Sequence, residues 1–168
     1  MLYTSFELAQ RHNACDRSLA TFLGVKEDEH KIAVAAEKYG RDKLIPLIDV
    51  LNVLGVKDCL WAFRATTDEA QAKIMAVKFA IACADRVLIH YESKYPGYNQ
   101  PREAIEAARN YLLNPSKETA DAAYAAAYAA ADAAYAAAYA AADAAYAAAR
   151  AVEGEWQVKK LKELLEES

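Results

Sequence analysis

The chain has 168 residues, with 20 basic and 24 acidic side chains and a formal net charge of −4 at pH 7. This length allows one domain with a sizeable core, so we expect a single domain over residues 1–168. The acidic balance argues against general nucleic-acid binding, and no apolar run reaches the length of a membrane span.

The cysteines and the N-terminal segment indicate the compartment. Cys15, Cys59 and Cys83 are odd in number and widely spaced, which is typical of a reduced compartment rather than of a disulfide framework. The first fifteen residues are polar and lack the apolar segment of a secretory signal. We therefore expect a cytoplasmic protein.

Short helices are predicted along the first 65 residues, because cap and turn residues separate their apolar periodic segments. The expected helices run from Thr4 or Ser5 to about His12, over Cys15–Leu23 closed by Gly24, from Asp28 to Gly40, over Leu44–Leu54 with Pro46 in the first turn and Gly55 at the end, and over Val56–Ala65. No segment alternates apolar and polar residues as a half-buried strand does. The pattern predicts an all-α fold.

Two longer helices are predicted next. A capping box formed by Thr66 and Glu69 would start a helix that ends near Ser93. Its expected buried face consists of Ile74, Val77, Ile81, Ala84, Leu88 and Tyr91. After a loop at Tyr95–Gln100, Pro101 would begin a helix. The apolar side of that helix is expected to consist of Ala104, Ile105, Ala108, Tyr111 and Leu112.

An alanine-rich segment follows a break at Asn114–Ser116. Of the 32 residues from Ala120 to Ala151, 23 are alanine, and the unit D-A-A-Y-A-A-A-Y-A-A-A occurs twice in succession from Asp121. Alanine has the highest helix propensity, so we predict a long helix over residues 116–152, capped by Ser116. Gly154 is expected to kink or end it before an amphipathic helix over 153–168. The whole would be a bundle of six to seven helices.

The eleven-residue unit places its tyrosines and aspartates on one narrow stripe of the helix and leaves the rest bare alanine. The stripe has two interpretations. Tyr124, Tyr128 and Tyr135 would line a polar binding groove, or they would form the seam that faces the core. The alanine face is too apolar to be left exposed, so it would lie inside the bundle or pair with a second copy in a homo-oligomer.

Most catalytic and cofactor motifs are absent from the sequence. There is no phosphate-binding glycine loop, no nucleophile elbow and no paired-histidine metal motif. His12 and Cys15 could share a helix face, but the clustered spacing of a zinc site is missing. A nucleophilic cysteine would need a histidine base that the sequence does not place near it. We expect no metal, no cofactor, no catalytic residue and no enzymatic activity.

Two groups of residues are candidates for binding. Asp58, Trp61 and Arg64 would share one helical face, and tryptophan and arginine dominate interaction hot spots. The alternative is a buried Trp61 with Asp58 capping its helix. The second group carries charges on both sides of the Tyr95–Gln100 loop, and its members are Asp85, Arg86, His90, Glu92, Arg102, Glu103 and Arg109. Salt bridges between two helices would explain this second group equally well.

The second group stands in segments that resemble a known family. Ala82-Cys83-Ala84-Asp85-Arg86-Val87-Leu88, a loop that contains a proline, and P-R-E-A-I-E-A-A-R at residues 101–109 are similar to the core of the Imm-5-like immunity proteins. The order around this core is similar too, and it comprises Cys15, the Asp58-x-x-Trp61-x-x-Arg64 segment, the alanine-rich helix and Trp156-Gln157. The resemblance covers nearly the whole chain.

The resemblance implies a non-enzymatic protein that neutralises a toxin or defence effector by binding to it. Members of such families occur in bacterial toxin–immunity loci and in phage genomes, where the role would be anti-defence. An alternative is a sponge that sequesters a nucleotide-like signal in a pocket with arginine and tyrosine side chains. A structural helical module is the third hypothesis.

Overall fold

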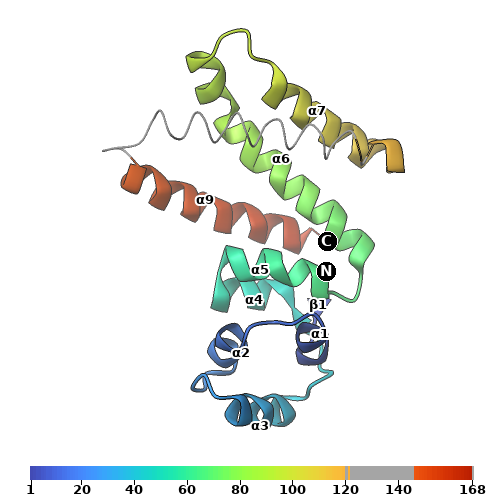
Figure 1. Cartoon of the computed structure of the whole chain (residues 1–168), viewed down its shortest axis with the longest axis vertical. Coiled ribbons are helices and arrows are strands. Elements are labelled where there is room, and N and C mark those ends of the chain that lie inside the picture. The colour runs from blue at the N-terminus through green and yellow to red at the C-terminus, as the bar shows by residue number, and fades with distance from the viewer. Residues whose placement is uncertain (120, 122–145, 168) are drawn as a thin grey trace. The chain divides into compact units, whose positions relative to one another are not determined.

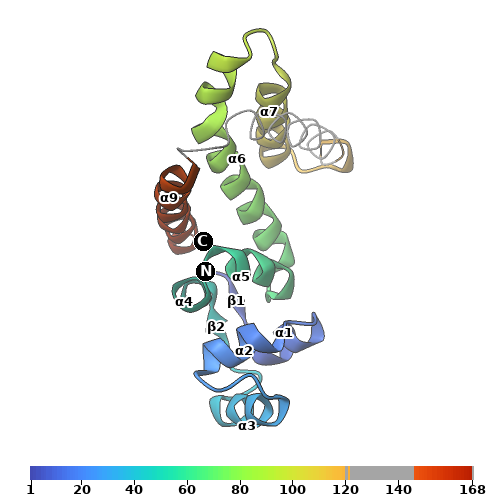
Figure 2. The same ribbon diagram turned by 60° about the vertical axis from the view of Figure 1, so that its left-hand side comes forward.

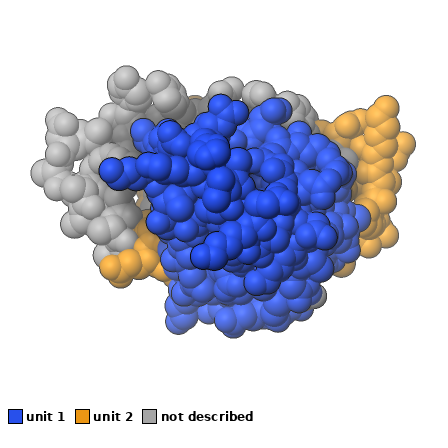
Figure 3. Space-filling view, turned by 90° about the horizontal axis from the view of Figure 1, so that it is seen from below, with its two compact units in different colours: residues 1–76, 157–168 blue, residues 77–156 orange. Residues whose placement is uncertain are grey.

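The computed structural model describes residues 1–119, 121 and 146–167. Packing divides the chain into two compact units, coloured separately in Figure 3: unit 1 contains residues 1–76 and 157–168, and unit 2 contains residues 77–156. The described secondary structure is helical apart from two strands of two residues each, so the predicted all-α fold is confirmed. The single domain over 1–168 stays a prediction.

Unit 1 is built from short helices that the sequence predicted closely (Figure 1). Its elements are β1 (Tyr3–Thr4), α1 (Phe6–Arg11), α2 (Asp16–Leu23), α3 (Glu29–Tyr39), β2 (Ile45–Pro46), α4 (Leu47–Leu54), α5 (Val56–Ala62), the 3-10 helix η1 (Phe63–Ala65), the start of α6 (Glu69–Lys94) and the end of α9 (Tyr146–Glu166). The predicted caps are confirmed at Ser5 and Asp28, whose side chains accept from the backbone N–H groups of Leu8 and Lys31.

One correction concerns the segment before α4. The helix begins at Leu47 rather than Leu44, because Thr4 pairs with Ile45 and Tyr3 with Pro46 in a short antiparallel ladder. Pro46 is therefore the residue before the helix and does not lie in its first turn. The N-terminal strand is held further by the Thr4 hydroxyl, which is buried and donates to the Ala65 carbonyl at 2.6 Å.

A second correction concerns the start of α6. Thr66 was expected to cap it, but the Thr66 hydroxyl is buried and donates backward to the Phe63 carbonyl at 3.3 Å. Asp68 caps the helix instead, since its carboxylate accepts from the Gln71 N–H at 2.9 Å. The Thr66 hydroxyl therefore bonds to η1 instead of capping α6.

The core of unit 1 joins distant segments of the chain. Helix α4 packs against α2 and α5, and α2 packs against α3. Phe6, Phe22 and Tyr39 form a cluster of edge-to-face rings, with centroids 5.3 to 6.3 Å apart. Fully buried leucines from the two ends of the chain, Leu2 and Leu165, belong to the same unit.

Unit 2 contains the remainder of α6, α7 (Gln100–Leu113) and the start of α9; Figure 2 shows α6 and α7 side by side. Pro101 lies in the first turn of α7, as predicted. On α7 the predicted apolar side is confirmed, with Ala104, Ile105 and Tyr111 buried. On α6 the predicted face is half-buried where it is described, and the most buried residues are Ala72, Met75 and Phe79. The most buried face of α6 therefore lies on a different side of the helix from the predicted face.

The alanine-rich segment is described only at its two ends. The Ser116 hydroxyl accepts from the Thr119 N–H at 3.2 Å, so the predicted cap is confirmed. Residues 122–145, which include Tyr124, Tyr128 and Tyr135, lie outside the described residues. Gly154 does not end a helix, because α9 continues through it to Glu166; a kink at this residue stays a prediction.

Candidate functional site

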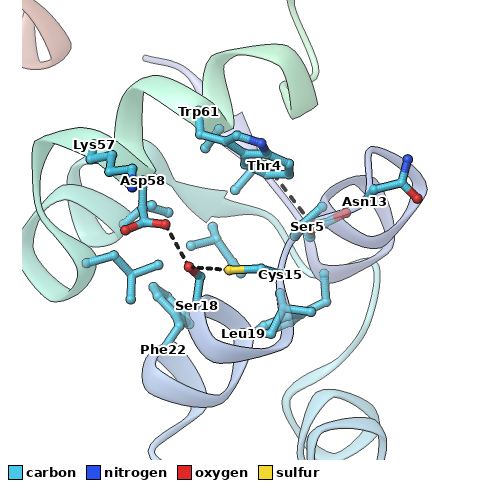
Figure 4. Close-up of a pocket in the computed structure, with 17 residues that line it drawn as sticks. Thr4, Ser5, Asn13, Cys15, Ser18, Leu19, Phe22, Lys57, Asp58 and Trp61 are labelled. Carbon is cyan, nitrogen blue, oxygen red and sulfur yellow. Dashed lines mark hydrogen bonds between the residues drawn. The ribbon is translucent and has the colours of Figure 1, made fainter. Parts of the chain in front are cut away.

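A pocket of about 280 Å³ lies within unit 1 (Figure 4). Its walls are mainly apolar, with a polar corner where α2 and α5 face each other. Its lining includes Phe6, Cys15, Ser18, Leu19, Phe22, Val50, Leu54, Lys57, Asp58 and Trp61. The two sequence-predicted residues Asp58 and Trp61 are therefore brought together at a concave surface.

A tight turn between α1 and α2 shapes one side of this pocket. Asn13 adopts a φ of 61°, in the left-handed region that asparagine tolerates better than most residues. The turn places Cys15 directly before α2, whose next turn presents Ser18, Leu19 and Phe22 to the pocket. Helix α5 provides the opposite side with Asp58 and Trp61.

The polar corner consists of three side chains in hydrogen-bond contact (Figure 4). The Ser18 hydroxyl donates to Oδ1 of Asp58 at 2.6 Å, and the Cys15 Sγ lies 3.1 Å from the same hydroxyl oxygen. The Ser18 hydroxyl, which can turn its single proton from Asp58 to the Cys15 thiolate, and the Ser18 backbone lower the pKa of the Cys15 thiol, although desolvation and the negative charge of Asp58 oppose this. The lining holds serine next to the thiol and no histidine among the described residues.

The pKa values of the other two thiols are raised. Burial raises the pKa of Cys59 to about 12, and its Sγ donates to the Leu47 carbonyl at 3.5 Å. Cys83 is half-buried, and desolvation, with a smaller contribution from Glu153, raises its pKa. Within the described part of the chain, no group of three or more His, Cys, Asp or Glu side chains is arranged to hold a metal ion.

The third member of the first predicted group, Arg64, contacts Trp61 but does not line the pocket. Arg64 is exposed and stacks over the Trp61 ring, 5.6 Å from its centroid, but it lines a second, more open depression of about 500 Å³. The alternative in which Asp58 caps α5 is wrong, because Gly55 precedes the helix and no side chain bonds to its first turn. Trp61 is half-buried.

The second predicted group forms ion pairs between α6 and α7. Arg109 pairs with Asp85 at 2.6 Å, and Arg102 binds both carboxylate oxygens of Glu92 at 2.7 and 2.8 Å. Contact with Glu92 raises the pKa of Arg102. These bonds agree with the interpretation that the charges hold two helices together.

Arg86 makes a different contact within unit 2. Its guanidinium pairs with Glu153 at 2.6 Å and lies 4.6 Å from the centroid of the Trp156 ring. Both partners belong to α9, and no spacing pattern in the sequence joins them to Arg86. The side chain of His90 lies outside the described residues, as do the three tyrosines of the predicted stripe.

Sequence reasoning missed Ser18, Glu153 and Trp156. Ser18 and Asp58 are far apart in the chain, so no periodic pattern joins them. However, the sequence contains a pattern that predicts the ion pairs between α6 and α7. Asp85 and Glu92 are seven residues apart, as are Arg102 and Arg109, and two such pairs match when the helices run antiparallel.

The family model described as "Imm-5 like putative immunity protein" matches residues 66–153, just over half of the chain. The chain therefore belongs to this family of immunity proteins. The match covers α6, α7 and the first part of α9, and it leaves out Cys15, Asp58–Arg64 and Trp156. It is thus shorter than the resemblance suggested.

No curated protein and no solved structure matches the chain significantly. Family membership implies a protein partner such as a toxin. Separately, no helix in the described ranges has both the length and the hydropathy of a membrane-spanning segment.

Proposed function

We propose that this protein is a cytoplasmic immunity protein that neutralises a toxin or a defence effector by binding to it, without catalysis. The observation that carries the proposal is the family match over residues 66–153. We further propose that the described part of the binding surface lies on α6, α7 and their connecting loop, because the family match contains all three.

The composition of these helices supports a role in protein binding. Ile89, Tyr98 and Leu113 are exposed at 69%, 58% and 76%, so their apolar side chains are available to a partner. We call these three residues the hairpin anchors. They are interspersed with charged side chains, and protein interfaces commonly combine apolar anchors with a polar rim.

The charged candidates have a supporting role in this proposal. Asp85, Arg102 and Arg109 are engaged in ion pairs that hold α7 against α6. They would therefore position the hairpin anchors, and Arg86 would do the same through Glu153. Arg64 and Trp61 lie in unit 1 and outside the matched residues, so we do not assign them to this surface.

The test is growth protection in a bacterial host. A toxin from the same locus would be expressed with the wild-type chain, with Ile89→Asp or with Leu113→Asp. The wild type should restore growth, and each variant should reduce protection by placing a charge in the interface. Val34→Asp is the matched control, since Val34 is 56% exposed on α3 and outside the proposed surface. Full protection by both hairpin variants would contradict the proposed surface.

A nucleotide sponge is less well supported by the described residues. Phosphate groups are usually bound by several arginines, lysines or backbone N–H groups. Lys57 is the one basic side chain in the described lining of the unit 1 pocket, and it stands beside Asp58 in the sequence. The arginines of unit 2 named above are paired with carboxylates.

The alanine-rich segment supports a further part of the proposal, namely self-association. Its bare alanine face would allow close approach of a second copy. Light scattering of the wild type and of a variant with Ala126→Glu and Ala137→Glu would test it. A wild type that is monomeric at micromolar concentration would exclude the oligomer, and an unchanged mass for a folded variant would exclude the alanine face as its interface.

A further inference from the structure

The unit 1 pocket lies outside the residues matched by the family and is not used by the proposed binding surface. Its volume of about 280 Å³ is just below the range of about 300–1,000 Å³ for sites that hold drug-sized molecules. An occupant would therefore be small, with one or two rings.

We infer that this pocket binds a small amphipathic amine, with its aromatic body against Phe6, Phe22 and Trp61 and its protonated amino group against the Asp58 carboxylate. The three rings line the pocket from α1, α2 and α5, and Leu19, Val50 and Leu54 extend the apolar wall. Burial of an apolar ring against such a wall removes its surface from water, which favours binding.

Asp58 determines the sign of the ligand charge. Of the described residues that line the pocket, it is the one carboxylate, and it is half-buried. Ser18 occupies Oδ1, and no hydrogen bond to Oδ2 is present among the described residues. A partly desolvated carboxylate with a free oxygen favours a cationic donor, because charge-assisted hydrogen bonds strengthen as water is excluded.

Lys57 is the single competing cation in the described lining. Its side chain is exposed, and it forms no ion pair with Asp58 in the described part of the chain. Its ammonium group can therefore stay hydrated while the ligand amine binds at the carboxylate. Its positive charge near the pocket would nevertheless weaken the binding of an amine. Removing this charge should therefore change the affinity for an amine in the opposite direction to Asp58→Asn.

The experiment is a calorimetric titration of the full chain with arylalkylamines, using tryptamine, tyramine and phenethylamine as probes. Tryptophol, the neutral alcohol analogue of tryptamine, and indole-3-acetate, an anionic analogue, serve as matched ligand controls. Saturable binding of an amine with one-to-one stoichiometry is expected. Tryptophol should bind about tenfold or more weakly than tryptamine, and indole-3-acetate more weakly still.

Two variants test the residues. Asp58→Asn keeps the size of the side chain and an oxygen that can accept from Ser18, and it should weaken tryptamine binding by about tenfold or more while tryptophol binding changes little. Lys57→Met should leave tryptamine binding as tight or tighten it by a fewfold. Circular dichroism of each variant verifies folding.

The inference is overturned if no amine binds saturably, if tryptophol or indole-3-acetate binds as tightly as tryptamine, or if Asp58→Asn and Lys57→Met shift the affinity in the same direction. Its outcome is independent of the growth assay, because Asp58 lies outside the proposed binding surface. Loss of growth protection by folded Asp58→Asn would contradict the proposed toxin-binding surface, whereas the titrations alone decide the amine inference.

Discussion

The described parts of units 1 and 2 are both helical, but different interactions stabilise each unit internally. Of the 23 apolar residues that are buried in the described part of the chain, only Phe79, Ala104, Ile105 and Tyr111 belong to unit 2. The described contacts of unit 2 instead include partly exposed ion pairs between α6, α7 and α9. A packed core can enclose a small pocket, whereas a charged helix pair offers an open surface to another protein. This contrast underlies the division of roles that we propose.

The largest effect should appear in the reactivity of the thiols. At pH 7.5 iodoacetamide should alkylate Cys15 at least about a thousandfold faster than Cys59, because the Cys15 pKa is lowered and the Cys59 pKa is raised to about 12. The rate at Cys15 should fall about tenfold per pH unit below its pKa. Peptide mass spectrometry after timed quenching measures each rate.

Cys83 provides the comparison with unit 2, since burial raises its pKa less than that of Cys59. Its rate should lie between the other two. Alkylation of Cys59 or Cys83 before Cys15 in the folded protein would contradict the described environment of the pocket.

The next effect concerns the core of unit 1. Leu47→Ala removes a fully buried side chain and should lower the free energy of unfolding of this unit by about 2–5 kcal/mol. Val53→Ala is the control on the same helix, because Val53 is 50% exposed and its truncation should cost well under 1 kcal/mol. Hydrogen exchange in α4 and α5 measures both. Equal losses for the two variants would argue against this core.

A smaller effect is expected at the start of α6. Asp68→Ala removes the cap and should destabilise the helix by about 1 kcal/mol, measured by exchange of the N–H groups in its first turn. Glu69→Gln is the control, because it keeps a good helix former and leaves the Asp68 cap in place. If Glu69→Gln destabilises this turn as much as Asp68→Ala, Asp68 is not the main cap.

The smallest effect should come from the ion pairs of unit 2. Arg109→Ala should reduce exchange protection in α7 by about 0–1 kcal/mol at low salt, and less at 0.5 M salt, because the Arg109 side chain is 51% exposed and its charge is screened. Arg17→Ala is the control in unit 1, since Arg17 pairs with Glu27 at 3.5 Å and is 82% exposed. A salt-independent loss in α7 would show that Arg109 acts by packing.

The sequence predicted the helices of unit 1 well because their ends carry local signals. Ser5, Gly24 and Asp28 cap helix ends by hydrogen bonds to backbone groups within a few residues, so their roles can be inferred from the local sequence. The incorrect predictions concern positions whose structure depends on residues far away in the sequence. Thr66 could not be excluded as a cap without knowing that it is buried, and the Ile45–Pro46 strand exists because Tyr3–Thr4 lies beside it.

The same distinction between local patterns and distant contacts applies to the candidate sites. Asp58 and Trp61 share a helix turn, and their proximity followed from spacing alone. Ser18 completes the polar corner from another helix, and only the folded chain brings it to Asp58. For α6 and α7, the sequence identifies the charged residues, and their matched seven-residue spacing favours the pairing that the structure has.

The most direct test of the division of roles measures each variant in both assays. Ile89→Asp and Asp58→Asn would each be assayed for growth protection against the toxin and for tryptamine binding by calorimetry. We expect Ile89→Asp to reduce protection and keep tryptamine binding, whereas Asp58→Asn should keep protection and weaken tryptamine binding by about tenfold or more. If folded Asp58→Asn loses protection while Ile89→Asp retains it, the toxin-binding surface is on unit 1 and the central claim is wrong.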